Sequence, residues 1–133
     1  MGGFETHVNQ LNKQSKLLQT YADAIAVFVE DLKKNDSFKD TLILTFSEFG
    51  RRVQQNAAGG TDHGAANNIF LIGENLKKKG FYNDAPNLLN LDANGDVRHT
   101  IDFRTVYATI LDKWLQVDDT SILNKSFSKL HFI

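Results

Sequence analysis

The sequence predicts an α/β domain in which a layered, mostly parallel sheet is flanked by helices. Two short runs, TLILTFS (41–47) and NIFLIG (68–73), are almost wholly apolar and are typical of strands buried on both faces of a parallel sheet. Apolar residues at helical spacing predict helices before and after them, in 8–34 and 102–115. The order helix, strand, polar segment, strand, hairpin, helix is typical of a layered α/β domain.

The first helix is predicted to bury one apolar stripe along its length. Lysines followed by Asn35 and Asp36 predict where it ends. The stripe consists of Leu11, Leu18, Tyr21, Ala22, Ile25, Phe28, Val29 and Leu32.

The C-terminal half is predicted from its turn and cap signals. Asn94 and Gly95 stand between two short alternating runs and predict a hairpin. The stretch around them, DANGD (92–96), lacks the spacing and the closing glutamate of an EF-hand, so we exclude that calcium site. Asp102 is well placed as the N-cap of the helix over 102–115, and residues 118–127 are expected to form a short helix or turn.

Composition restricts the classes of function. The chain has 133 residues, of which 41% are hydrophobic and 23% charged, so a single globular domain over 1–133 is expected. A net charge of −1 gives no electrostatic reason to expect nucleic acid or a membrane surface as a partner. No apolar run approaches the ~18 residues of a membrane helix. The absence of cysteine excludes disulfides, thiolate catalysis and zinc–thiolate sites.

A polar, glycine-rich segment between the two predicted strands carries residues that favour a binding site. Glu48 and Arg51 lie where the first strand ends, at the edge where α/β sheets bind ligands. Glu48, Asp62 and His63 are ligand types suited to Zn²⁺, Mn²⁺, Mg²⁺ or Ca²⁺. Arg51 is predicted to act in catalysis by neutralising an anionic oxygen of a phosphate or sulfate.

The N-terminal stretch adds Glu5 and His7 to the predicted metal ligands. Side chains two positions apart point the same way on an extended segment, so both can reach one ion. Structural alternatives remain, since Glu5 and His7 can be plain surface residues. Asp62 can cap a turn, His63 can be a hydrogen-bonded loop residue, and Glu48 can pair with a neighbouring arginine. The residues alone predict a metal site without deciding among these alternatives.

Four stretches carry a resemblance to a known family. They are GGFETH (2–7), TFSEFGRRV (45–53), GTDHG (60–64) and DFRTVYATILDKWL (102–115). In this order and spacing they resemble an uncharacterised bacterial family, a domain of unknown function, that is related to sulfatases and commonly exported through the twin-arginine pathway. That family is distantly similar to the alkaline-phosphatase superfamily.

The resemblance implies roles for individual residues. Glu48 stands where the superfamily has a metal-binding aspartate, and His63 where it has a metal-binding histidine. Glu5 and His7 resemble the aspartate and histidine that bind the neighbouring metal. Phe49 takes the place of a histidine ligand, and a phenyl ring cannot coordinate an ion. The resemblance therefore implies a binuclear site of which at least one half is incomplete.

The resemblance also implies a function for a longer protein. The superfamily's nucleophile lies upstream of these motifs and no segment here matches it, so the chain is expected to be a C-terminal part. Its partners would be the missing N-terminal region and an anionic ester substrate. Independently of the resemblance, the apolar runs 41–47 and 68–73 would leave strand edges and apolar surface uncovered, so the chain is expected to form a homo-oligomer. The expected contact surface is the exposed side of the sheet or an adjacent helix, and the alternative is the stripe on the 8–34 helix. The full-length protein would be a metal-dependent phosphate- or sulfate-ester hydrolase, periplasmic or exported. The alternative is a binding or scaffold module on a degenerate hydrolase fold.

Overall fold

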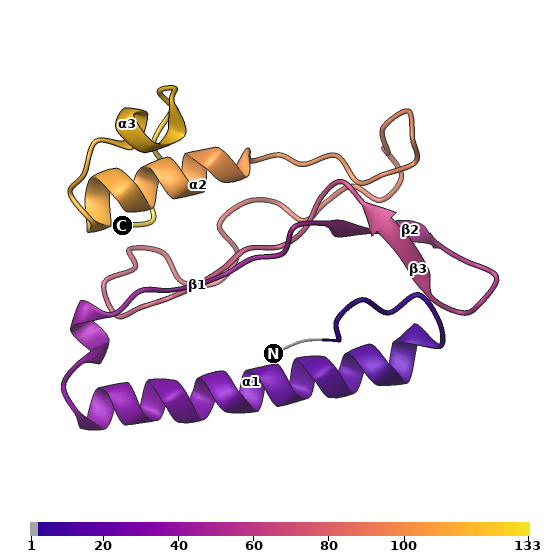
Figure 1. Ribbon diagram of the computed structural model, residues 1–133, viewed down its shortest axis with the longest axis horizontal. Helices are drawn as coiled ribbons and strands as arrows, with labels where there is room; N and C mark the ends of the chain where they lie inside the picture. Colours follow the sequence, from indigo (N-terminus) through magenta and orange to yellow (C-terminus); the bar gives the residue numbers. More distant parts are fainter. Residues whose placement is uncertain (1–2) are drawn as a thin grey trace. The chain divides into compact units, whose positions relative to one another are not determined.

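The computed structural model describes residues 3–133, which divide into two compact units. The first unit comprises the chain up to Glu74 together with Asn87–Arg98, and the second comprises Asn75–Pro86 and His99–Ile133. The described residues form one long helix, two short antiparallel sheets of two strands each, and short C-terminal helices (Figure 1). Within the described residues, no helix combines the length and the apolar character that crossing a membrane requires.

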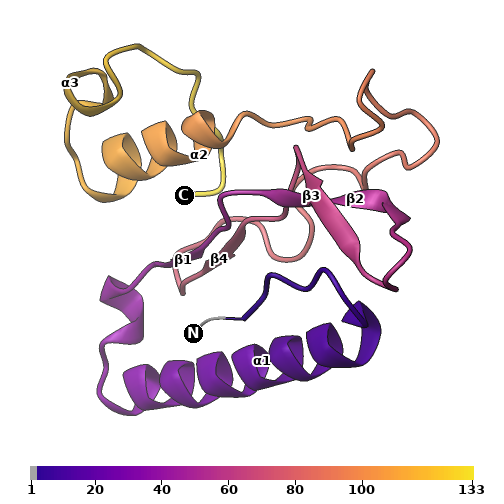
Figure 2. The ribbon, with the colours of Figure 1, turned by 45° about the vertical axis from the view of Figure 1, so that its right-hand side comes forward.

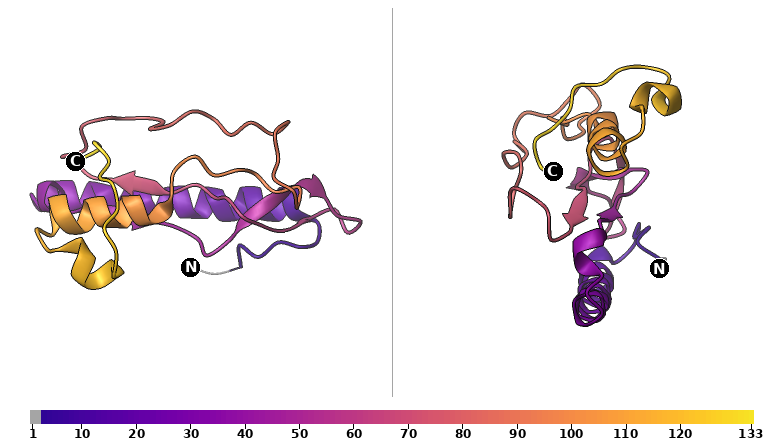
Figure 3. Two further views of the ribbon diagram at one scale, coloured as in Figure 1. Left: turned by 90° about the horizontal axis from the view of Figure 1, so that it is seen from above. Right: turned by 90° about the vertical axis from the view of Figure 1, so that its left-hand side faces the viewer.

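Helix α1 (Gln10–Lys34) confirms the helix predicted over 8–34, and it runs unbroken along its whole length (Figure 3). Lys33 and Lys34 occupy its last turn, where positive charge stabilises the negative end of the helix dipole. Asn35 ends it, as the sequence predicts. No residue of α1 is buried, and its most enclosed apolar side chains are half-buried. These half-buried side chains belong to Leu17, Tyr21, Ile25, Val29 and Leu32.

Two antiparallel pairs of strands form the sheets of the first unit (Figure 2). Strand β1 (Ile43–Thr45) follows a single 3-10 turn and pairs with β4 (Phe70–Ile72). Strand β2 (Gly50–Gln55) pairs with β3 (Thr61–Gly64), with an irregularity in register between them. In chain order, the β2–β3 hairpin therefore lies between β1 and β4, the two strands of the other sheet.

The predicted mostly parallel sheet is wrong, because every strand pair in residues 3–133 is antiparallel. The apolar runs 41–47 and 68–73 do contain strands, but these strands pair with each other, Leu44 opposite Leu71. Neither is buried on both faces, and the Phe70 side chain is 50% exposed. A parallel pair needs a crossover connection, usually a helix, that covers one face of the sheet. Here the connecting chain forms the β2–β3 hairpin instead, so the polar segment between the two apolar runs contains two strands of its own.

The second unit begins its helical part at Asp102, whose side chain accepts a hydrogen bond from the Arg104 N–H at 2.9 Å. Helix α2 (Phe103–Thr109) continues into a π-helical turn (Ile110–Trp114), which confirms the helix predicted over 102–115. Helix α3 (Asp119–Leu123) follows, where a short helix or turn was expected.

The apolar core of the second unit lies between α2 and the C-terminal tail. Val106, Ala108 and Phe132 are buried there. The tail is held by a hydrogen bond from the Leu130 N–H to the Thr109 hydroxyl, 2.8 Å long. The three buried apolar side chains thus give the second unit a small apolar core.

The predicted turn at Asn94 and Gly95 is present in the first unit. Gly95 has φ 78° and its N–H donates to the Asp92 carbonyl at 3.1 Å, a left-handed conformation that glycine adopts without strain. The flanking strands reduce to one antiparallel bridge, between Leu91 and Val97. The turn is therefore tight, but no extended hairpin accompanies it.

Candidate metal centre

The β2–β3 hairpin supplies the frame of the site. Arg51 on β2 lies directly opposite His63 on β3. Phe49 directly precedes β2, two positions before Arg51, and its ring stacks on the His63 ring. Arg51, Phe49 and His63 are therefore neighbours at this end of the hairpin.

The N-terminal segment runs alongside the turn of this hairpin. Val8 forms an antiparallel bridge with Gly59, and the next two backbone N–H groups donate to carbonyls of the turn at 3.0 and 2.9 Å. The close approach requires glycine at position 60, where a Cβ atom would stand 2.2 Å from the His7 carbonyl oxygen. This approach carries Glu5 and His7 to the hairpin, although His63 follows more than fifty residues later.

Glu5, His7 and His63 form a group that could hold a metal ion, their ligand atoms lying within 4.8 Å of one another. Glu5 Oε1 is 3.5 Å from His7 Nε2 and 3.1 Å from His63 Nε2. The two imidazole rings have their centroids 4.9 Å apart. All three side chains are partly exposed, so solvent and small ligands can reach them.

Asp62 lies on the other side of the His7 ring. Its Oδ1 is 3.4 Å from His7 Nδ1, whereas His7 Nε2 faces Glu5. A histidine ligand usually donates its second ring N–H to a carboxylate in this way, which fixes the ring's orientation. A hydrogen bond from Asn56, assisted by His7, lowers the pKa of Asp62 below its ordinary value and favours the ionised acceptor. Asp62 therefore fits the role of an outer partner of His7.

Asn56 is a residue of the candidate site that the sequence analysis missed. Its amide nitrogen donates to the His7 carbonyl (3.0 Å) and to Asp62 Oδ1 (3.2 Å). Its amide oxygen accepts from the backbone N–H groups of Ala58 and Gly60, both at 3.0 Å. The side chain thus uses two donors and two acceptor positions at once. An asparagine just before a glycine-rich turn is the available sequence signal, because such residues bond the backbone two positions on.

Arg51 joins the two segments of the site. Its guanidinium donates to the Thr61 carbonyl and to the Phe4 carbonyl, each at 2.8 Å. The catalytic role predicted for Arg51 stays a prediction, but these bonds place its charge beside the group. Glu48 is exposed and does not belong to the group of three ligands.

The spacing of the donors fits a small transition-metal ion. Ligands bound about 2.0–2.1 Å from a tetrahedral zinc ion lie about 3.4 Å apart. The two separations from Glu5 Oε1, 3.5 and 3.1 Å, are close to that value. The remaining separation, between the two imidazoles, is within 4.8 Å, so the three ligand atoms lie at spacings that one ion could bridge after side-chain adjustment.

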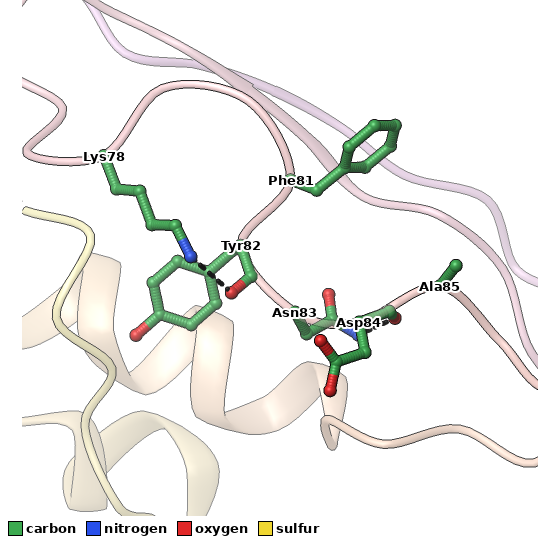
Figure 4. A pocket seen from close by; sticks show the side chains of 6 residues that line it. All are labelled: Lys78, Phe81, Tyr82, Asn83, Asp84 and Ala85. Atoms are coloured by element: carbon green, nitrogen blue, oxygen red, sulfur yellow. Dashed lines mark hydrogen bonds between the residues drawn. The ribbon is translucent and has the colours of Figure 1, made fainter.

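A separate pocket of about 330 Å³ lies in the second unit (Figure 4). The Lys78 ammonium donates to the Tyr82 carbonyl at 3.0 Å and lies 5.4 Å from the centre of the Tyr82 ring. The pocket shares no residue with the metal group, and its lysine is directed at its own wall. Its lining consists of Lys78, Phe81, Tyr82, Asn83, Asp84 and Ala85.

Comparison with protein families identifies the family of the chain. A family model described as "Protein of unknown function (DUF1501)" matches residues 1–127, so the chain belongs to that family. This confirms the expected membership of a family whose function is unknown. No curated protein and no solved structure matched the chain.

Proposed function

We propose that this member of the DUF1501 family holds a divalent transition-metal ion between Glu5, His7 and His63. The observation that carries the proposal is the convergence of one carboxylate and two imidazoles from two distant segments of the chain. Three further features support it: a glycine that admits the close approach, a carboxylate behind the His7 imidazole, and an amide that donates to that carboxylate and to the His7 carbonyl.

Among the ions that the sequence suggests, the donor set favours Zn²⁺. Calcium takes six to eight oxygen ligands and magnesium prefers octahedral oxygen coordination. Imidazole nitrogen suits zinc, and catalytic zinc sites often combine two histidines with one glutamate. Three protein ligands leave a coordination position open for a substrate oxygen.

Within the full-length protein, we propose that this site serves the hydrolysis of a phosphate or sulfate ester. The support is the resemblance to sulfatases and the open, partly exposed set of three ligands. The bound ion would act as a Lewis acid toward an ester oxygen. Glu5 offsets part of the ion's charge, Asp62 orients His7, and Arg51 contributes positive charge that favours an anionic substrate.

The nucleophile is expected in an N-terminal region that acts as the partner of this chain, in an exported or periplasmic protein. We therefore expect no turnover of aryl phosphate or aryl sulfate by the 133-residue chain alone. Separating a nucleophile from its metal removes both activation and positioning, each of which contributes several orders of magnitude.

A second candidate function is a non-catalytic binding or scaffold module with a structural ion. Two observations favour it: Glu48 lies outside the ligand group, and Phe49 cannot coordinate. The two candidates share the metal site and differ in turnover. Full-length protein that hydrolyses an aryl ester, with loss of activity in His63→Ala, would support the hydrolase; zinc binding without turnover would support the module.

Calorimetric titration of the metal-free chain with Zn²⁺ tests the shared metal site. We expect one equivalent to bind, and His63→Ala to weaken binding more than about 100-fold, since losing an outer partner alone costs about 10–100-fold. His99→Ala is the matched control, because His99 is also exposed but lies in the second unit, and it should bind like the wild type. Wild-type chain that takes up no zinc at micromolar concentration would overturn the proposal.

Asn56→Ala is a second variant for the same titration, and its expected loss of zinc affinity is smaller than that of His63→Ala. It leaves all three ligands in place and removes the hydrogen bonds to the His7 carbonyl and to Asp62. We expect zinc binding about 10–100-fold weaker than in the wild type. Gln54→Ala, an exposed position on the same hairpin, is the control and should leave the affinity unchanged.

A further inference from the structure

We propose that Phe49 is a positioning residue whose ring sets the orientation of the His63 imidazole within the metal group. This inference rests on the proposed metal site, and it gives Phe49 a role there although a phenyl ring cannot coordinate. The two rings are stacked, with centroids 3.7 Å apart and planes inclined by 9°.

The strand register explains why these two rings meet. Arg51 pairs with His63 across the hairpin, and Phe49 lies two positions before Arg51, directly ahead of the start of β2. Phe49 and His63 are therefore diagonal neighbours, a relation within reach of aromatic side chains. The backbone geometry that delivers His63 to the site also delivers Phe49.

Phe49 is itself held firmly enough to act as a platform. Its carbonyl accepts hydrogen bonds from the Ser47 hydroxyl at 2.9 Å and from the Asn67 amide at 2.8 Å. The Arg51 guanidinium carbon lies 5.5 Å from the centre of the Phe49 ring, and two bonds to backbone carbonyls fix that guanidinium. Contacts with three other residues thus fix the Phe49 backbone and ring.

His63 needs such a platform because its side chain is 43% exposed. An exposed imidazole samples several orientations, and binding an ion removes that freedom. A ring already stacked in the binding orientation loses less, which strengthens binding. The cost of immobilising one side chain corresponds to an effect of about three- to tenfold on the dissociation constant.

Two measurements on the 133-residue chain test the inference. The first is the proton chemical shifts of the His63 ring in metal-free protein, assigned by comparison with His63→Ala. Stacking on a phenyl ring moves these signals upfield, and we expect that shift in the wild type and in Phe49→Tyr but not in Phe49→Leu. If the His63 ring protons of the wild type resonate where those of a free histidine do, the inference is overturned. This part of the test needs no substitution at Phe49.

The second measurement is the Zn²⁺ dissociation constant of the same variants. We expect Phe49→Tyr, which keeps an aromatic ring, to bind like the wild type and Phe49→Leu, which keeps apolar bulk without the ring, to bind about three- to tenfold more weakly. Equal affinities of Phe49→Leu and wild type would contradict the positioning role. Failure of the wild type to bind zinc would instead overturn the proposed metal site, while the ring shifts would still report the stack.

Discussion

The two units of the chain are stabilised in different ways. In the second unit, Val106, Ala108 and Phe132 are buried and form a small apolar core. In the described part of the first unit, no apolar side chain is buried; the buried positions are Thr6, Gly50 and Gly60. The first unit carries the metal group and the long helix, and in place of a buried core it has half-buried apolar side chains, backbone pairing, side-chain hydrogen bonds and close approaches at glycine.

This difference shows how the site can be well ordered without a core around it. Thr6, Gln10 and Gln14 bond one another between 2.8 and 2.9 Å, and Gln10 also accepts from the Thr61 hydroxyl at 3.0 Å. The start of α1, the N-terminal segment and β3 are thereby linked through polar groups. Such links fix geometry, but they leave the apolar surfaces of the unit in contact with water.

The largest effect expected from the comparison is on the core of the second unit. Replacing Phe132 with alanine removes a ring that packs edge-on against Tyr82, with centroids 5.9 Å apart, and should lower the free energy of unfolding by about 3–5 kcal/mol. Denaturant unfolding measures the change. Leu89→Ala in the first unit is the control, because Leu89 is 98% exposed, and it should change stability by less than about 0.5 kcal/mol. Similar losses in both variants would remove the distinction between the units.

The next effect concerns the uncovered side of α1, defined by Leu11, Leu18 and Ala22. All three are exposed, and they recur at the spacing of one helix face. We propose that the 133-residue chain covers this surface by self-association, detectable by sedimentation at micromolar concentration. Leu18→Asp should weaken the association about tenfold or more, equivalent to about 1.4 kcal/mol.

The control for this prediction is Asn12→Asp, which introduces the same charge at an exposed polar position of α1. It should leave the association nearly unchanged. A chain that sediments at 15.0 kDa at every concentration would show that the uncovered helix face has no affinity for a second copy.

The smallest effect is an acid sensitivity of the second unit. Hydrogen bonds from Arg104 lower the pKa of Asp102 to about 2, below its value of about 3.9 in an unfolded chain. Because the folded-state pKa is the lower one, the stabilisation is present above about pH 4 and is lost as the pH falls toward about 2. Asp102→Ala should cost about 1 kcal/mol at neutral pH and flatten the stability profile in that window. Asp84→Ala should keep the wild-type profile.

The sequence by itself determined the local elements of this protein. The helix over 10–34, the capped helix that begins after Asp102 and the turn at Gly95 depend on residues close together in the chain, and the structure confirms each. The chemical types of Glu5, His7 and His63 were also visible. Local signals of this kind predict structure correctly because residue spacing, helix caps and glycine conformations act over only a few residues.

Tertiary structure alone decided how the strands pair and which polar residues meet. The apolar sequences of 41–47 and 68–73 fit strands of a parallel or an antiparallel sheet equally well, because strand propensity does not specify which strand pairs with which. Their pairing was settled by the hairpin that forms between them.

That hairpin also fixed the site. It set Asp62 behind His7, left Glu48 outside the ligand group and gave Phe49 a histidine to stack on. Nothing within a few residues of Glu48 or Asp62 encodes these outcomes. They depend on the position of the N-terminal segment, which reaches the hairpin only where Gly60 has no side chain to block it.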